Sequence, residues 1–323
     1  MSELLCITNA GWSGVIEALK TTTKVLGKGS VITVNGSIPS YSNAAQMIMN
    51  DVPQILLLGG YDGFFHSAIN RLRGRSKIIV VWCSNILQSE LTNEIDQLNK
   101  MIDMLKNSII DGIAFVEDGS YKSMKRTFPN LNFLYFPTVP VPRTKPFKIE
   151  LDPSKFHVDI FCTPDGRKNI YNQLLAYANL AQVHVNYDKS TYVNIISKFD
   201  NVKNYGRMPI ELLDQYSASV DLCSQISANE SFNYVAADHM FLGVPVIASK
   251  FVPAVAETKS QLIHKYLIVQ DFTSVEEIYS KVKYIKDNPS LKQELNKIVK
   301  DEINIIAHER AEILKYNYKM ATK

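Results

Sequence analysis

Short apolar segments alternate with longer amphipathic segments along the chain, and this alternation restricts the possible folds more than any other feature. The run Gln54–Gly59 is apolar without a break, which is typical of a strand in a parallel sheet that is covered on both faces. A glycine-containing turn, Gly59–Gly63, follows this run, and the next stretch, Phe64–Leu72, has a helical pattern. Strands that alternate with helices predict an α/β protein built on doubly wound parallel sheets.

The same pattern gives approximate bounds for each expected element. We expect strands at 4–8, 30–34, 54–59, 77–83, 109–116, 132–136, 156–163, 182–185, 219–223, 244–248 and 267–269. We expect helices at 13–25, 42–50, 64–72, 90–106, 120–127, 170–181, 190–199, 210–217, 231–242, 274–286, 290–306 and 307–316.

A cluster of prolines interrupts this alternation near the middle of the chain. Pro137, Pro140, Pro142 and Pro146 fall within ten residues, which indicates a stiff linker. The order of strand and helix then starts again. We therefore predict two domains, residues 1–145 and residues 146–323, each with its own sheet.

Composition excludes several classes of protein. Of the 323 residues, 46% are hydrophobic and 21% are charged, which is normal for a globular protein, and the net charge of +3 is too small to indicate a nucleic-acid partner. We find no secretory signal and no apolar run long enough for a transmembrane helix, so a cytoplasmic location is expected. The four cysteines lie far apart in the sequence, without metal-ligand spacing, and we expect buried free thiols.

The segment Glu230–Ser249 carries the most specific chemistry. Two carboxylates, Glu230 and Asp238, stand eight residues apart. A helix that begins at Ser231 would complete about two turns by Asp238. The free N–H groups at such a helix N-terminus can hold a phosphate, while the acids can accept hydrogen bonds from sugar hydroxyls.

The rest of this segment predicts how the helix is packed and how it ends. Val235, Ala236, His239 and Met240 are interpreted as apolar or neutral packing positions. Gly243 is expected to end the helix in the left-handed conformation, and a buried strand follows it.

The segment resembles the signature of the retaining GT-B glycosyltransferases, the family that includes sucrose and glycogen synthases and many mannosyltransferases. That signature is Glu, seven residues and Glu, followed by a small-residue helix and Gly-x-Pro-Val-Ile. Here Glu230 is the first acid, Asp238 replaces the second Glu, and Gly243–Ile247 matches the last part. The resemblance implies a GT-B fold, in which two Rossmann-like doubly wound domains face each other across a cleft.

The resemblance also implies a role for each domain and for particular residues. Residues 1–145 would form the acceptor-side domain, and residues 146–323, with the C-terminal helices, would bind the nucleotide-sugar donor. Lys168, which precedes Asn169 at the start of a helix, and the adjacent Arg167 would neutralise the donor diphosphate. Together with Glu230 they are the expected catalytic residues. The expected substrate-binding residues are Gly11, Ser84, Asn85, Gly206, Arg207, Met208, Ser231, Phe232, Asn233 and Asp238.

The resemblance further implies the kind of reaction. In the family, a sugar passes from a nucleotide diphosphate sugar such as a UDP-sugar with retention of anomeric configuration, and no protein nucleophile takes part. We find no Asp-x-Asp and no clustered histidines, so no metal and no cofactor is expected beyond the donor itself. The acceptor stays open: a glycan, a lipid, a protein or DNA.

Two alternative interpretations remain. Many members of the family carry a His just after the strand at 77–83, where this chain has Ser84 and Asn85. The compact length, the missing His and the mild basicity also suit phage-type enzymes that glycosylate modified bases in DNA. The missing His and the Asp at position 238 equally suit a GT-B-like binding protein without catalysis. A basic cluster, Arg71 to Lys77, is interpreted as a solvated loop, with contact to an anionic acceptor as the less favoured interpretation.

Overall fold

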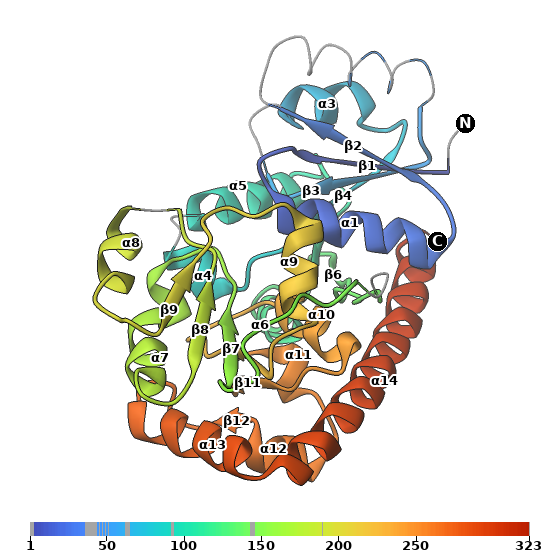
Figure 1. Cartoon of the computed structure of the whole chain (residues 1–323). Coiled ribbons are helices and arrows are strands. Elements are labelled where there is room, and N and C mark those ends of the chain that lie inside the picture. Colours follow the sequence, from blue (N-terminus) through green and yellow to red (C-terminus); the bar gives the residue numbers. More distant parts are fainter. Residues whose placement is uncertain are drawn as a thin grey trace. The chain divides into compact units, whose positions relative to one another are not determined.

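The computed structural model describes residues 3–35, 52–61, 65–91, 94–142, 146–188 and 190–322, with 44, 46, 48 and 50. The chain divides into two compact units: Met1–Val139 with His308–Lys323, and Pro140–Ala307. Within the described residues each unit contains a six-stranded parallel sheet with flanking helices (Figure 1). The predicted α/β class is therefore confirmed. The end of the chain, which the sequence assigned to the second domain, groups with the first unit.

The first unit is built on a sheet with the strand order β2-β1-β3-β4-β5-β6. All its neighbouring strands are parallel. Its strands are β1 (Leu4–Asn9), β2 (Ser30–Val34), β3 (Ile55–Gly59), β4 (Lys77–Trp82), β5 (Gly112–Phe115) and β6 (Phe133–Tyr135). Its helices are α1 (Ser13–Leu26), α3 (Phe65–Leu72), α4 (Ile86–Leu91), α5 (Ile95–Lys106), α6 (Asp118–Thr127) and the end of α14 (Pro289–Thr322).

Both faces of this first sheet are buried, as the unbroken apolar strands predict. Successive side chains of a strand point to opposite faces, so Leu56 and Leu57 belong to two different core clusters. The cluster that contains Leu57 also contains Leu314 and Tyr318 of α14. The last turns of α14 thus cover one face of the first sheet, which explains why the end of the chain belongs to the first unit.

The second unit has the strand order β12-β11-β10-β7-β8-β9, and all its neighbouring strands are again parallel. Its strands are β7 (His157–Ile160), β8 (Gln182–Val185), β9 (Val202–Asn204), β10 (Leu222–Gln225), β11 (Val246–Ser249) and β12 (Ile268–Val269). Its helices are α7 (Ile170–Tyr177), α8 (Ser190–Ile196), α9 (Ile210–Ser217), α10 (Tyr234–Leu242), α11 (Pro253–Ala256), α12 (Gln261–Tyr266), α13 (Val275–Asp287) and the first part of α14.

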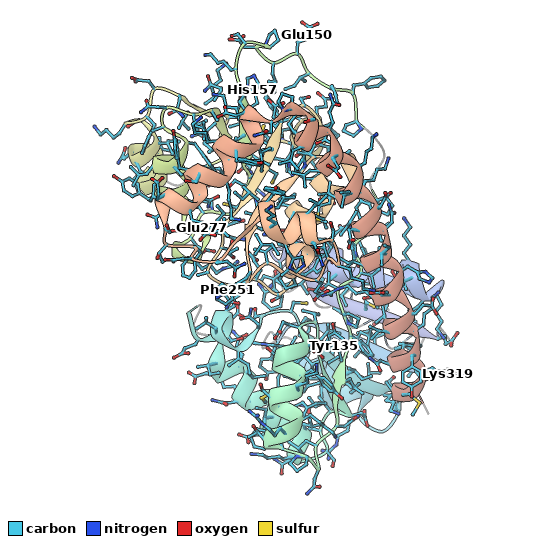
Figure 2. All side chains as sticks on the ribbon, turned by 90° about the horizontal axis from the view of Figure 1, so that it is seen from below. Tyr135, Glu150, His157, Phe251, Glu277 and Lys319 are labelled. Carbon is cyan, nitrogen blue, oxygen red and sulfur yellow. The ribbon has the colours of Figure 1, made fainter. Side chains whose placement is uncertain are left out.

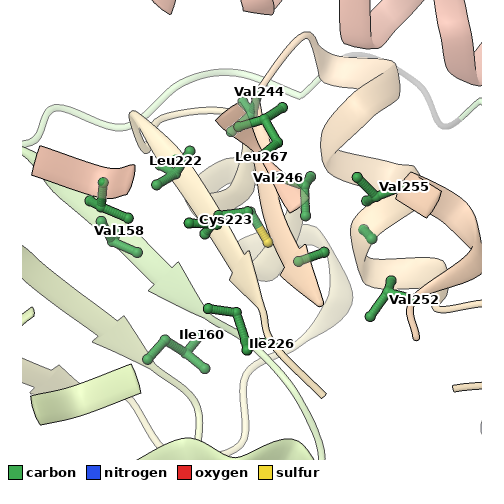
Figure 3. Close-up of a cluster of buried hydrophobic side chains, with 14 of the residues drawn as sticks. Val158, Ile160, Leu222, Cys223, Ile226, Val244, Val246, Val252, Val255 and Leu267 are labelled. Atoms are coloured by element: carbon green, nitrogen blue, oxygen red, sulfur yellow. The ribbon is translucent and has the colours of Figure 1, made fainter. Parts of the chain in front are cut away.

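The core of the second unit is apolar around β10 and β11. Val158, Leu222 and Val246 come from neighbouring strands and pack in one buried cluster (Figure 3). Figure 2 shows His157, which starts β7, and Phe251, which follows β11, at opposite ends of this unit. This separation fits a parallel sheet, because all its strands begin at one edge and end at the other.

Several elements differ from their expected bounds, and three of the differences concern whole elements. The segment 202–204, for which no strand was expected, pairs with β8 as the edge strand β9. Helix α14 is continuous from 289 to 322, where two helices were expected, because it contains no Gly and no Pro after its first residue. The expected helix 90–106 is replaced by α4, which begins earlier at Ile86, and α5, which begins at Ile95.

One expected helix, at 42–50, lies largely outside the described residues. No helix in the described part of the chain combines the length and the apolar composition that crossing a membrane requires.

Candidate functional site

The strand order of the second sheet reverses between the neighbouring strands β7 and β10. From β7 the chain adds β8 and β9 on one side, whereas β10, β11 and β12 extend the other side. The loops that follow β7 and β10 therefore leave the same edge of the sheet as direct neighbours. In open α/β sheets this reversal point is where ligands bind.

The loop after β7 forms a short basic turn. Asp165 begins a 3₁₀ turn, Gly166–Lys168, and its Oδ1 accepts a hydrogen bond from the backbone N–H of Arg167 at 3.0 Å. Asn169 has a φ of 51°, and this left-handed residue separates the turn from α7. Its side-chain amide donates to the carbonyl of Phe272, which fixes the end of the turn.

The cations of this turn meet Glu230, which is delivered by the loop after β10. Nη1 of Arg167 lies 3.1 Å from Oε2 of Glu230, and Nζ of Lys168 contacts Oε1 of the same carboxylate. Glu230 is only 8% exposed. Burial alone raises the pKa of Glu230, but Lys168 and Arg167 outweigh it and hold that pKa below its ordinary value. The acid is therefore ionised at neutral pH and shares its charge with two cations.

Helix α10 begins beside this cluster but three residues later than the sequence predicts. Asn233 has a φ of 81°, so the helix cannot start at Ser231 and begins at Tyr234 instead. The side chain of Asn233 accepts from the N–H of Ala236 at 2.9 Å and donates to Gln225 at 3.0 Å. Asp238 consequently lies in the second turn of the helix, half buried, and not two full turns from its start.

One hydroxyl group at this site has no hydrogen-bond partner among the described residues. Oγ of Ser231, next to Glu230, is buried without one. A buried hydroxyl of this kind is costly to leave unpaired, and a phosphate or sugar oxygen would satisfy it. Phe232 packs in the core of the unit, and its carbonyl accepts from the N–H of Ala254 at 3.1 Å.

Three of the expected substrate-binding residues, Gly206, Arg207 and Met208, lie on the loop after β9, at the same edge of the sheet. Gly206 has a φ of 63°, and its N–H donates to Oδ1 of Asn204 at 3.1 Å. Arg207 is exposed and Met208 is half buried. Since β9 is separated from β7 by β8, this loop lies beside the charged cluster and not within it.

The remaining expected site residues belong to the first unit, where each has a local partner. Gly11 follows β1, and its N–H donates to Oδ1 of Asn9 at 2.8 Å. Ser84 donates to Glu94 at 2.7 Å, and Oδ1 of Asn85 accepts from the N–H of Gln88 at 2.8 Å. These contacts organise the turns after β1 and β4, and the proposed ligand contacts of the three residues stay predictions.

The basic cluster Arg71–Lys77 lies at the opposite edge of the first sheet. It runs from the end of α3 to the first residue of β4, whereas Gly11, Ser84 and Asn85 follow the strands to which they are attached. In a parallel sheet these are different edges. The position of the cluster argues against contact with a ligand bound at the carboxyl edge of that sheet.

One buried group of metal-ligand type occurs in the described residues, formed by Asp159, Cys223 and His239. Nε2 of His239 lies 2.6 Å from Oδ2 of Asp159. Two ligands about 2 Å from one tetrahedral ion stand about 3.3 Å apart, so this distance is that of a direct hydrogen bond. His239, interpreted from the sequence as a packing position, is indeed buried, and it also contacts the carboxylate of Asp159, which the sequence did not predict.

The cysteines supply no nucleophile at the site. All four are free, as expected, but only Cys6 and Cys223 are fully buried, whereas Cys83 and Cys162 are half buried. Cys162 is the one nearest to the charged cluster in sequence. Burial raises the pKa of the Cys162 thiol to about 11. The thiol is therefore protonated at neutral pH.

Comparison with solved structures identifies the architecture. Sucrose-phosphate synthase from Thermosynechococcus elongatus superimposes with a TM-score of 0.71 at 15% identity, over 98% of each chain. A UDP-forming α,α-trehalose-phosphate synthase from Burkholderia xenovorans gives 0.69 at 10% identity, over 100% of this chain and 99% of the other. The chain has the GT-B fold.

A third solved structure with this fold carries ligands. HepE of Anabaena in complex with UDP and glucose gives a TM-score of 0.69 at 14% identity, over 99% of this chain and 98% of HepE. No protein-family profile matches the sequence, and no curated protein matches it either. The GT-B assignment was predicted from Glu230–Ser249 and is confirmed by these structures.

Proposed function

We propose that this chain is a glycosyltransferase that moves a sugar from a UDP-sugar to an acceptor hydroxyl with retention of anomeric configuration. One observation carries the proposal. Arg167 and Lys168, which follow β7, meet Glu230, which follows β10, at the reversal point of the second sheet. The GT-B fold and the UDP bound to HepE support a nucleotide diphosphate sugar as the donor.

The two cations would hold the leaving diphosphate. Glycosyl transfer breaks the bond between the anomeric carbon and a phosphate oxygen, so negative charge grows on that oxygen in the transition state. Fixed cations stabilise this charge without reorganising, provided that they are held in place beforehand. Asp165 and Glu230 hold Arg167 in place, because its guanidinium group donates one hydrogen bond to each of the two carboxylates.

Glu230 would exchange partners when the donor binds. Before a donor binds, Glu230 pairs with both Arg167 and Lys168, and Asp165 also pairs with Arg167, so the two cations face two carboxylates. The diphosphate of a donor brings its own negative charge to the same cations. The carboxylate can then accept hydrogen bonds from sugar hydroxyls, and the hydroxyl of Ser231 can donate to a phosphate oxygen.

The retaining outcome follows from a front-face reaction. The acceptor oxygen forms its bond to the anomeric carbon on the face that the phosphate leaves, and the acceptor proton passes to the departing phosphate oxygen. The protein then contributes positioning and electrostatics and forms no covalent intermediate. We also propose that Arg167 and Lys168 take the place of a divalent cation, that no further cofactor is used, and that the reaction takes place in the cytoplasm.

The acceptor is left as a hydroxyl group on a glycan, a lipid, a protein or DNA. The basic cluster Arg71–Lys77 is the feature of the first unit best suited to DNA, yet it lies at the amino edge of its sheet. Glycosyl transfer to a modified base in DNA is therefore the less favoured candidate. The other alternative, a binding protein without catalytic activity, would have the same donor site as the enzyme and would differ from it only in transferring no sugar.

A thermal-shift screen of nucleotides followed by a transfer assay tests the proposal. A donor present at 100 times its dissociation constant stabilises the folded chain by about 2.7 kcal/mol, so UDP and UDP-sugars should raise the melting temperature. Release of UDP from the stabilising donor, with an acceptor library, then separates an enzyme from a binding protein. If no nucleotide or nucleotide sugar raises the melting temperature at millimolar concentration, the proposal is wrong.

A further inference from the structure

A buried ion pair ties helix α10 to strand β7 in the second unit. Asp159 is the third residue of β7 and His239 is the sixth residue of α10. The side chains are 0% and 1% exposed, and Nε2 of His239 lies 2.6 Å from Oδ2 of Asp159. Neither residue is among those that the resemblance implies for the donor site.

The hydrogen-bond partners of His239 determine its protonation state. Its Nδ1 lies 2.7 Å from the carbonyl oxygen of Val235, which can only accept. Its Nε2 faces the carboxylate of Asp159, which also accepts when ionised. With Asp159 ionised, both ring nitrogens carry a proton, and His239 is then a buried imidazolium ion with Asp159 as its counter-ion.

The electrostatic surroundings agree with this assignment. Burial alone lowers the pKa of His239, but the charge and the hydrogen bond of Asp159, the carbonyl of Val235 and the nearby Asp238 together raise it above its ordinary value. The thiol of Cys223 on β10 faces the same carboxylate, and its pKa is raised well above the ordinary range by burial and by Asp159. The thiol is thus neutral, and the imidazolium is the cation that compensates Asp159 here.

The pair connects the two elements that supply the charged cluster. Strand β7 leads directly into the turn with Arg167 and Lys168. Helix α10 follows the loop with Glu230, and Val235, whose carbonyl receives the second imidazole proton, lies in its first turn. One side chain therefore holds the first turn of α10 from within and anchors the helix to β7.

We propose that the Asp159–His239 ion pair is a positioning device for the donor diphosphate, because it sets the start of α10 and Glu230 against the basic turn after β7. This inference rests on the proposed function. It predicts that removing either charge weakens UDP binding even where the chain stays folded. A pair with a purely structural role would change stability and leave the affinity for UDP unaltered.

The protonation state is tested first, in the full chain without ligand. Long-range ¹H–¹⁵N NMR spectra that correlate the ring nitrogens with the ring carbon-bound protons distinguish an imidazolium from a neutral ring, with His239→Gln used to assign the signal. At pH 7.5 His239 should show two protonated nitrogens, whereas an unperturbed histidine is mostly neutral. A neutral His239 would overturn the inference.

The positioning role is tested by the affinity for UDP, measured by isothermal titration calorimetry well below the melting temperature. Asp159→Asn and His239→Gln each leave the other charge buried without its partner, and each should weaken UDP binding at least tenfold. The double variant replaces the ion pair by a neutral amide pair that can still hydrogen-bond, so it should bind UDP within about threefold of the wild type. If one single variant fails to fold, the other single variant carries the test, since each removes one charge of the pair.

A matched control separates positioning from general loss of stability. Val282 is a fully buried residue of α13 in the same core cluster. Val282→Ala lowers stability through a cavity and should leave UDP affinity unchanged. Wild-type affinity in both single variants, or a double variant that binds as weakly as a single variant, would overturn the positioning role. No binding of UDP to the wild type would instead overturn the proposed function on which that role rests.

Discussion

Nη1 of Arg167 lies 3.1 Å from Oε2 of Glu230, although the two stand 63 residues apart along the chain. The contact exists because β7 and β10 are neighbours in the second sheet, so the loops that follow them leave the same edge side by side. A carboxylate placed between two cations in a buried site can hold them ready for a diphosphate, and it also competes with that diphosphate. This competition makes binding and turnover separable by mutation.

Glu230→Gln should separate the two properties. The amide keeps the size of the side chain but removes the charge that competes with the donor, so UDP should bind as tightly as to the wild type or several-fold more tightly. Transfer should fall by roughly 100-fold or more, because the hydrogen bonds to the developing oxocarbenium-like sugar are weakened. Calorimetry with UDP and steady-state transfer rates measure the two effects. Parallel loss of affinity and turnover would contradict the exchange of partners proposed for Glu230.

Lys168→Met should weaken the binding of UDP by about 10- to 100-fold, which corresponds to about 1.4–2.7 kcal/mol. The change removes a cation that is only 8% exposed, and it keeps an unbranched apolar stem. Transfer should be abolished, and raising the salt concentration should weaken UDP binding less in the variant than in the wild type. Lys155→Met, at an exposed position before β7, is the matched control and should bind UDP normally.

The stability of the second unit should depend on pH through His184. Burial, together with a smaller effect of the neighbouring His157, lowers the pKa of His184 to about 4. The folded chain therefore binds fewer protons than the unfolded chain between pH 6.5 and 4. Stability is complete above pH 6.5 and falls by up to about 3 kcal/mol as the pH decreases through this window.

His184→Gln is the variant that tests this dependence. Nδ1 of His184 is 2.8 Å from the hydroxyl of Tyr205, and its Nε2 is 2.9 Å from Nδ1 of His157. A glutamine amide offers one acceptor and one donor for these two partners but does not titrate. Urea denaturation at pH 7.5 and pH 5 should show a smaller difference in the variant. An equal difference in both proteins would exclude His184 as the cause.

Gly243→Ala should destabilise the chain by about 1–2 kcal/mol. Gly243 ends α10 with a φ of 75°, and an added Cβ would lie 3.2 Å from the carbonyl oxygen of Asn296. Gly14→Ala is the opposite control, because Gly14 lies in α1 and a Cβ there meets no atom within 4 Å. The control should leave stability unchanged or raise it by up to about 1 kcal/mol. Thermal denaturation of both variants decides between these expectations.

Much of the fold was predictable because it depends on local patterns. Unbroken apolar runs such as Gln54–Gly59 indicate strands that are buried on both faces, and β3 is one of them. Gly243 ends α10 as predicted, since a left-handed residue is easily formed only by glycine. The segment Glu230–Ser249 predicted the GT-B fold through its resemblance to the signature of a known glycosyltransferase family.

Other features could not be read from local patterns. The helix predicted from Ser231 starts at Tyr234, because Asn233 takes a left-handed conformation while its side chain bonds to Gln225 on the neighbouring strand. His239 looked like a neutral residue on a packed helix, because its partner Asp159 stands 80 residues earlier. A search for a carboxylate within the first strand of each predicted sheet could have indicated a buried partner for that histidine.

The sequence alone thus determined most of the order of strands and helices, the end of α10 and the residue types available for phosphate binding, since these depend on neighbours along the chain. Only the tertiary structure decided that β10 lies beside β7, that α14 returns its last turns to the first unit, and that Asp159 meets His239. The physical reason is that strand order and buried charge pairing are set by contacts between distant segments. Such contacts produce no periodic pattern of residues in the sequence.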